Sequence, residues 1–292
     1  MKSVLVGIDG SNDSRVALRW AAAVTDAIML RLRALWVWEY PADTVVSVGG
    51  IDLPDPEAAD AHVAEQLETL LTEELGAEDA RRATAKVARG SPARAILRAA
   101  ETTPKMIVVG SRGLGGFKGL LLGSVGRQLA EHAPCPVTIV PRTTPVEPVS
   151  LETIVVGVDG SRHAARAMLC ATDFAGRVGA EVVVVHAVES LQPIDPGAHA
   201  PEVDPRPELD ARADLVEEWA SPLRQLGVPY RVRVVEGDPR TALLEVAEEE
   251  EADGIVVGSR GRGPVRKLLL GSVAASVAQF SERPVTIVPK RA

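Results

Sequence analysis

Short aliphatic runs alternate with amphipathic segments along the chain. The run VLVGI at 4–8 is almost wholly apolar, which is typical of a strand buried on both faces of a sheet. Residues 14–30 then place apolar side chains such as Val16, Trp20 and Val24 at helical spacing. The pattern therefore predicts a buried strand followed by a helix, and the same alternation continues to the end of the chain.

Each half of the chain contains five predicted strands. In the first half we expect strands at 4–8, 32–38, 84–88, 106–110 and 136–140, with helices at 14–30, around 67–71, at 92–101 and at 124–132. In the second half we expect strands near 153–158, 181–187, 231–235, 254–258 and 284–288. Alternating strands and helices predict an α/β fold with a mostly parallel, doubly wound sheet and right-handed crossovers.

The chain also repeats itself. VLVGIDGS at 4–11 returns as IVVGVDGS at 154–161, and IVVGSRG and PVTIVP each occur twice in the same order. Residues 142–151, RTTPVEPVSL, are polar and contain prolines, which is typical of a linker. We therefore expect two tandem copies of one domain, at 1–143 and 151–292.

Composition excludes several classes of protein. Neither half has more basic than acidic residues, and the 292-residue chain has a net charge of −8, which argues against a nucleic-acid partner. No run approaches the ~20 apolar residues of a membrane span, and the N-terminus does not resemble a signal peptide. The two cysteines, Cys135 and Cys170, lie at unrelated positions in the halves, which fits a reducing compartment. We expect a cytoplasmic protein without a membrane partner.

Two glycine-spaced stretches carry the most specific chemistry. GSRGLGGFKGLLLGS at 110–124 and GSRGRGPVRKLLLGS at 258–272 share the spacing Gly-x2-Gly-x9-Gly-Ser. Each follows a fourth strand and opens a helix, so its backbone N–H groups are placed to bind phosphate. Asp9 and Asp159 follow the first strands at the same edge, where a carboxylate can accept hydrogen bonds from a ribose or a base. The pattern predicts nucleotide binding.

The stretches differ from two other phosphate-binding motifs. No Gly-Lys-Ser/Thr closes them, and they do not follow the first strand as the dinucleotide fingerprint does. A structural alternative stays open, in which each stretch is a tight turn followed by a helix, with Ser124 as the N-cap of the first. Retention of four spaced positions in both copies, while the residues between them differ, favours a ligand site.

The motifs VGIDGS, GSRG-x9-GSV and PVTIVP together resemble the universal stress protein family, in its tandem-domain, ATP-binding type. The resemblance implies two Rossmann-like domains of the adenine nucleotide alpha hydrolase-like kind, each with a five-stranded parallel sheet in the order 3-2-1-4-5 flanked by helices. It implies ATP as the ligand, with or without Mg2+. The implied contacts are Asp9, Val37, Gly110, Gly113, Gly123, Ser124 and Val125 in the first half, and Asp159, Ala187, Gly258, Gly261, Gly271, Ser272 and Val273 in the second.

The resemblance also implies roles for these residues. The aspartate would contact adenine or ribose, Val37 would wall the adenine pocket, and the glycines and the serine would hold ribose and phosphates. The second half departs from the first, with Pro264 in place of Gly116, Arg262 in place of Leu114, and the smaller Ala187 in place of Val37. We therefore expect two ATP sites of unequal affinity.

The expected function is a nucleotide-dependent protein of stress response or regulation. Two alternatives stay open: a slow ATPase, and an interaction module that binds no nucleotide. The sequence offers no catalytic residues, and metal ligands stay unknown. PVTIVP ends each half with an apolar edge strand, and such edges tend to pair. We expect strand 136–140 to pair antiparallel with strand 284–288, and the resemblance points to the same pairing and to a homodimer.

Overall fold

The computed structural model describes residues 3–39, 55–102, 104–114, 122–145, 149, 151–188, 206–262 and 269–290. The chain divides into two compact units, one reaching to Val149 and the other covering Ser150–Lys290. Each unit is described by itself. The expected pairing of strand 136–140 with strand 284–288 stays a prediction, as do the expected domain limits. Gly116 and Pro264, which we expect to distinguish the two glycine stretches, lie outside the described residues.

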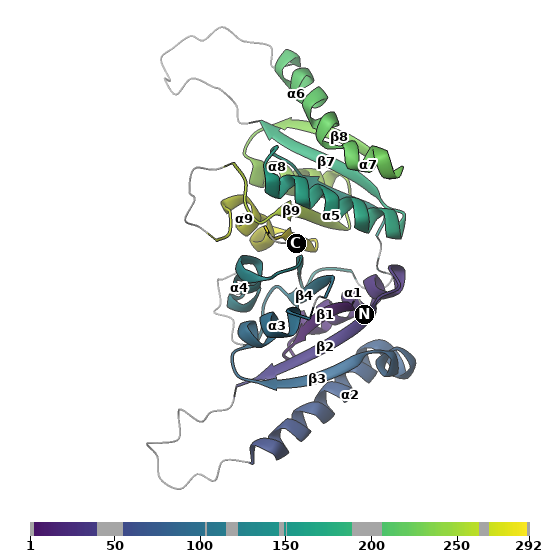
Figure 1. Cartoon of the computed structure of the whole chain (residues 1–292), viewed down its shortest axis with the longest axis vertical. Coiled ribbons are helices and arrows are strands. Elements are labelled where there is room, and N and C mark those ends of the chain that lie inside the picture. Colours follow the sequence, from purple (N-terminus) through teal and green to yellow (C-terminus); the bar gives the residue numbers. More distant parts are fainter. Residues whose placement is uncertain are drawn as a thin grey trace. The chain divides into compact units, whose positions relative to one another are not determined.

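Each unit contains a five-stranded parallel sheet, and its strand order is the predicted one (Figure 1). The first sheet has the order β3-β2-β1-β4-β5 and the second the order β8-β7-β6-β9-β10. All the strand pairs within each unit are parallel. The strands are β1 (Ser3–Ile8), β2 (Arg31–Trp38), β3 (Thr84–Arg89), β4 (Met106–Gly110), β5 (Val137–Val140), β6 (Thr153–Gly157), β7 (Glu181–Val188), β8 (Tyr230–Glu236), β9 (Gly254–Gly258) and β10 (Val285–Val288).

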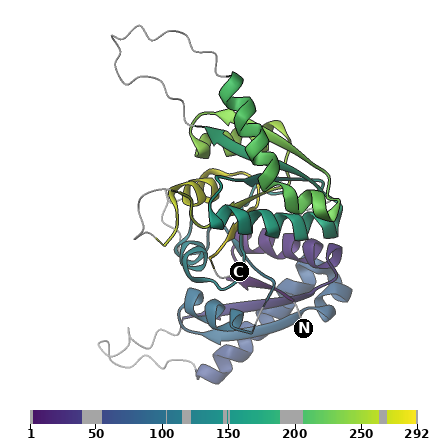
Figure 2. The ribbon, with the colours of Figure 1, turned by 45° about the horizontal axis from the view of Figure 1, so that its top comes forward.

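Helices cover both faces of each sheet (Figure 2). In the first unit, α1 packs beside α2 and α3 packs beside α4; in the second, α5 packs beside α7 and α8 packs beside α9. The helices are α1 (Asn12–Ala27), α2 (Pro56–Arg82), α3 (Pro92–Ala100), α4 (Ser124–His132), α5 (Arg162–Val178), α6 (Arg206–Trp219), α7 (Ser221–Leu226), α8 (Pro239–Glu249) and α9 (Ser272–Phe280). In the described part of the chain, none of these helices combines the length and the hydropathy that a membrane crossing needs.

Local sequence explains where the first helix of each unit begins. The Ser11 side chain accepts a hydrogen bond from the Ser14 N–H, and the Ser161 side chain accepts one from the Ala164 N–H. These are N-caps, which satisfy backbone donors that have no partner within the helix. The first helix ends at Ala27, three residues earlier than predicted, because Met29 adopts a φ of 51° that breaks helical geometry before β2.

The second helical segment differs between the units. In the first unit α2 bends at Gly76, whose φ of 78° lies in the left-handed region. In the second unit the corresponding segment is two helices, α6 and α7, separated by Ala220, with a proline in the first turn of α7. Apolar periodicity predicts the helical character of these segments but not these interruptions.

The sheet centre forms the core and fixes where a ligand can enter. In β1 every residue except Gly7 is buried, whereas no residue of the edge strand β3 is buried. Strand β1 lies between β2 and β4, so the crossovers leave it in opposite directions. In open α/β sheets this switch point opens a crevice at the carboxyl ends of the strands. Asp9 directly follows β1 and the glycine stretch continues from the end of β4, so both lie at this edge of the sheet.

Candidate functional site

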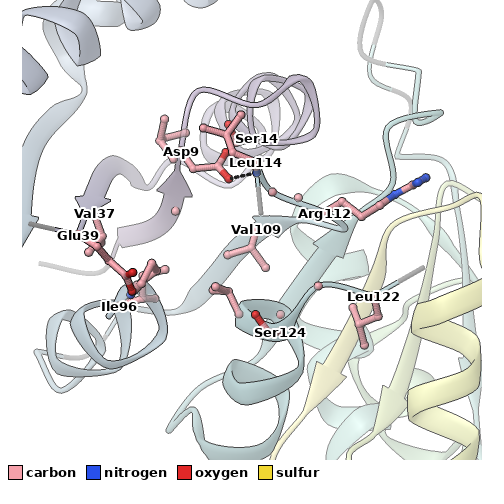
Figure 3. Close-up of a pocket in the computed structure, with 18 residues that line it drawn as sticks. Asp9, Ser14, Val37, Glu39, Ile96, Val109, Arg112, Leu114, Leu122 and Ser124 are labelled. Atoms are coloured by element: carbon pink, nitrogen blue, oxygen red, sulfur yellow. Dashed lines mark hydrogen bonds between the residues drawn. The ribbon is translucent and has the colours of Figure 1, made fainter. Parts of the chain in front are cut away.

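The Asp9 carboxylate ties the end of β1 to the glycine stretch. Its Oδ1 accepts hydrogen bonds from the backbone N–H and the hydroxyl of Ser11, at 3.0 and 2.6 Å. Its Oδ2 accepts one from the backbone N–H of Leu114 at 3.0 Å (Figure 3). A Cβ atom on Gly113 would lie only 2.3 Å from Asp9 Oδ2. Position 113 therefore has no room for a side chain, because the Asp9 carboxylate already occupies that space.

Gly110 lies too close to the first helix to carry a side chain. A Cβ atom there would lie 2.6 Å from the backbone carbonyl carbon of Asp13 and 2.8 Å from its Cβ. The close approach brings the Asp13 side chain to the glycine stretch. Its Oδ2 accepts hydrogen bonds from the Ser111 hydroxyl at 2.9 Å and the Arg112 N–H at 3.1 Å. The start of α1 and the start of the glycine stretch are thus fixed to each other.

The N-terminus of α4 presents backbone N–H donors at this edge, and no described side chain caps it. Its N-cap is Gly123, which has an extended backbone and no side chain to accept hydrogen bonds from the first turn. The Gly123 N–H itself donates to the Ser111 carbonyl at 2.8 Å. The interpretation of Ser124 as the N-cap is therefore wrong: Ser124 is the first helical residue, and it is exposed. An uncapped helix N-terminus of this kind attracts anions.

These elements enclose a cavity of about 480 Å³. Figure 3 shows Val37, Glu39 and Ile96 on one side of it, Asp9 and Leu114 on another, and Leu122 and Ser124 below. All seven residues expected from the first half line this cavity: Asp9, Val37, Gly110, Gly113, Gly123, Ser124 and Val125. The structure therefore brings them together, while their contact with ATP stays a prediction.

Sequence reasoning missed part of the lining. Ile96 of α3 and Leu122 add apolar surface, and Ser14, Glu39 and Arg112 add polar groups. The helix that carries Ile96 packs against the sheet from a distant part of the sequence, so no local motif marks it. Arg112 lies within the glycine stretch itself, where its position could have indicated a lining role. In the described part of the chain, no three His, Cys, Asp or Glu side chains are grouped to hold a metal ion.

The second unit repeats the backbone frame. Asp159 Oδ1 accepts from the Ser161 N–H and Oδ2 from the Arg262 N–H, both at 2.9 Å. Gly271 is the uncapped N-cap of α9, so Ser272 and Val273 lie in its first turn. Ala187 lies near the carboxyl end of β7, as Val37 does in β2. The seven residues expected from this half therefore occupy the same places in the fold.

The side chains around this second frame differ. The Arg262 guanidinium lies over the ring of Trp219, 5.8 Å from its centroid, and Trp219 meets the His186 ring edge-on at 5.4 Å. His186 Nδ1 is hydrogen-bonded to the Val158 carbonyl at 2.8 Å. The matching position in the first unit, Leu114, is 77% exposed. The two sites thus share a backbone arrangement but not the residues that surround it.

A family model decides the identity of this fold. The model of the universal stress protein family matches the chain twice, at residues 1–141 and 150–289. The chain belongs to the universal stress protein family. A universal stress protein of Mycolicibacterium smegmatis is 32% identical over 296 residues, covering 99% of this chain and 97% of that protein. One from Mycobacterium tuberculosis is 30% identical over 303 residues, covering 97% and 94%.

A solved structure that covers the whole chain agrees with the fold. A universal stress protein from Archaeoglobus fulgidus, 24% identical in sequence, covers 99% of this chain and 98% of its own with a TM-score of 0.68. A universal stress protein solved in complex with cAMP is 31% identical over 48% of this chain and 98% of its own, with a TM-score of 0.38. The expected tandem arrangement of two universal stress protein modules is thus confirmed.

Proposed function

We propose that this universal stress protein is a nucleotide-dependent regulatory protein that binds one ATP in each unit, at the carboxyl edge of each sheet. The main support is the cavity of about 480 Å³ in the first unit, which gathers all seven predicted residues. Its volume lies within the ~300–1,000 Å³ of typical small-molecule sites. The N-terminus of α4, which lacks a side-chain cap, opens into the same cavity.

Each part of the cavity suits one part of a nucleotide. The N–H groups in the first turn of α4, from Ser124 to Gly126, can donate to phosphate oxygens, and the helix dipole favours their negative charge. Val37 and Ile96 offer an apolar wall for the base. Asp9 Oδ2 accepts a single hydrogen bond within the described part of the chain, so it keeps a lone pair for a ribose hydroxyl or a base amine.

The residues fit a nucleotide with or without a metal ion. Mg2+ prefers phosphate oxygens and water to an all-protein cage, and the described residues contain no cluster of metal-binding side chains. A bound Mg2+ would supply charge neutralisation at the phosphates. Homodimerisation and a cytoplasmic location stay predictions from the sequence.

Ser124→Glu and Ser272→Glu test the proposal. Both serines are exposed at the first position of their helices, where a glutamate favours the helix but repels a phosphate. Calorimetry with ATP should give two sites in the wild type and one in each variant, whereas the double variant should bind none. Ser124→Gln and Ser272→Gln are matched controls of similar size without charge. Each control should bind at least tenfold more tightly than its glutamate counterpart.

Two results would contradict the proposal. One is purified wild-type protein that neither carries a nucleotide, by mass spectrometry of the extract, nor binds ATP; this would favour the interaction module. The other is ATP binding unchanged in the double glutamate variant, which would place the site elsewhere. Steady-state phosphate release from the saturated protein separates a regulatory binder, which holds ATP intact, from a slow ATPase.

A further inference from the structure

One position beneath each glycine stretch carries a different charge in the two units. A Cβ atom on Gly110 would meet the Asp13 carbonyl carbon at 2.6 Å and its Cβ at 2.8 Å, and a Cβ atom on Gly258 would meet the same atoms of His163 at 2.7 and 2.8 Å. Asp13 and His163 therefore occupy equivalent places at the start of α1 and of α5. Only their side chains differ.

In the first unit a buried carboxylate lies directly behind the expected phosphate site. Asp13 is 7% exposed, and its Oδ2 accepts from the Ser111 hydroxyl and the Arg112 N–H. The Ser111 carbonyl in turn accepts from the N–H of Gly123, the N-cap of α4. One residue thus separates the negative charge from the helix N-terminus. A charge in so dry a place is weakly screened and acts on a bound anion.

In the second unit this negative charge is absent from the equivalent position. The backbone link is the same, with the Gly271 N–H donating to the Ser259 carbonyl at 2.8 Å. His163 stands beneath it, and its buried Nε2 has no hydrogen-bond partner in the described part of the chain. Burial, together with the charges of Arg260, Arg166 and Lys290, lowers the pKa of His163, which favours the neutral form of this side chain.

We propose that the residue at this position sets how strongly each site prefers a nucleoside triphosphate over a nucleoside monophosphate. Asp13 weakens that preference in the first unit, whereas His163 lets the second unit keep it. This inference rests on the proposed nucleotide binding. A triphosphate places about two more negative charges than a monophosphate at the helix N-terminus, so a nearby carboxylate penalises it more. The first site thus discriminates less against a monophosphate than the second site does, although both bind ATP.

The test compares ATP with AMP in one site at a time. Ser272→Glu closes the second site for measurements on the first, and Ser124→Glu closes the first for measurements on the second. In each background the quantity measured is the ratio of the AMP to the ATP dissociation constant, by calorimetry at fixed ionic strength and without divalent cations, so that ATP keeps its two additional negative charges. We expect this ratio to be about tenfold higher in the second site, which corresponds to about 1.4 kcal/mol.

Three substitutions separate charge from shape. Asp13→Asn keeps an acceptor oxygen for Ser111 and Arg112 but removes the charge, so it should raise the ratio of the first site about tenfold. His163→Asp introduces the charge and should lower the ratio of the second site by a similar factor. His163→Asn is its neutral control and should leave that ratio within twofold of the wild type. Thermal melting of each variant verifies that the fold is retained.

The outcomes distinguish this inference from the proposed function. If both sites bind ATP but Asp13→Asn and His163→Asp leave the ratios unchanged, the charge selection is wrong while nucleotide binding stands. If His163→Asn lowers the ratio as much as His163→Asp does, the effect comes from loop geometry and the inference is equally wrong. If the wild type binds neither ATP nor AMP, both the proposed function and the inference fail.

Discussion

The two units share the backbone of their sites but not the side chains around it. The close approaches at Gly110 and Gly258 agree to 0.1 Å, being 2.6 and 2.7 Å from the facing carbonyl carbons. The N–H of each N-cap glycine, Gly123 or Gly271, donates to the Ser111 or Ser259 carbonyl at 2.8 Å. Around this shared backbone, Asp13 of the first unit corresponds to His163 of the second, and Leu114 corresponds to Arg262. The repeated glycines are therefore explained by close packing within each unit, whereas the charged residues around the two sites differ.

The largest expected effect tests that shared frame. Gly110→Ala and Gly258→Ala would each press a methyl group against the backbone of the first helix of their unit, at less than 3 Å. Because backbone cannot move aside as a side chain can, each substitution should lower the free energy of unfolding by about 3 kcal/mol. Urea unfolding followed by circular dichroism measures both losses. They should agree within about 0.5 kcal/mol, because the two close approaches are nearly identical.

Gly176→Ala is the matched control for these substitutions. It lies inside α5, where an added Cβ would be 3.4 Å from a Val228 methyl group, an ordinary contact. Alanine is favoured over glycine within a helix by about 1 kcal/mol, so this variant should be as stable as the wild type or more stable. A loss at only one of Gly110 and Gly258 would show that the frames are not equivalent.

A smaller loss of stability is expected where a glycine faces the aspartate of its own unit. Gly113→Ala would place a Cβ atom 2.3 Å from Asp9 Oδ2, and Gly261→Ala would place one 2.6 Å from Asp159 Oδ2. Each should cost about 2 kcal/mol of unfolding free energy, because the carboxylate must leave its backbone donors. In an Asp9→Ala background that clash disappears, so Gly113→Ala should then cost less than about 0.5 kcal/mol.

The double-mutant cycle is measured by urea unfolding in both units. The coupling energy between the glycine and the aspartate should be larger in the first unit, where the distance is shorter. If Gly113→Ala costs the same with and without Asp9, the glycine is required by something other than the carboxylate, such as the ligand path.

These distances also show what sequence could and could not predict. The parallel sheet and the meeting of Asp9 with the glycine stretch follow from buried aliphatic runs and from the switch point of such a sheet, whereas the strand order follows from the family resemblance. All three are found. The reason for each glycine was not predictable, because Asp13 and Gly110 are distant in sequence and their contact depends on how α1 crosses β4. Ile96 was missed for the same reason: α3 reaches the cavity only through tertiary packing.

The smallest expected effect concerns the arginine found in the second unit alone. The Arg262 guanidinium lies over the Trp219 ring, 5.8 Å from its centroid, and holds the start of the glycine stretch to α6. An exposed cation such as Arg262 above an indole stabilises by about 0.5–1 kcal/mol, so Arg262→Leu should lower the unfolding free energy by that amount. Leu114→Arg in the first unit is the matched control and should change stability by less than about 0.5 kcal/mol, as most surface substitutions do.

A cycle with Trp219→Leu decides whether the indole causes this effect. In the Trp219→Leu background, Arg262→Leu should cost almost nothing, because the stacking partner is already gone. Trp219 is the one tryptophan of residues 151–292, so unfolding of the second unit can be followed by its fluorescence after Trp20, Trp36 and Trp38 are replaced by phenylalanine. An unchanged cost of Arg262→Leu without Trp219 would mean that Arg262 acts through its contact with Gly160 instead, where its Nη2 atom lies against the backbone.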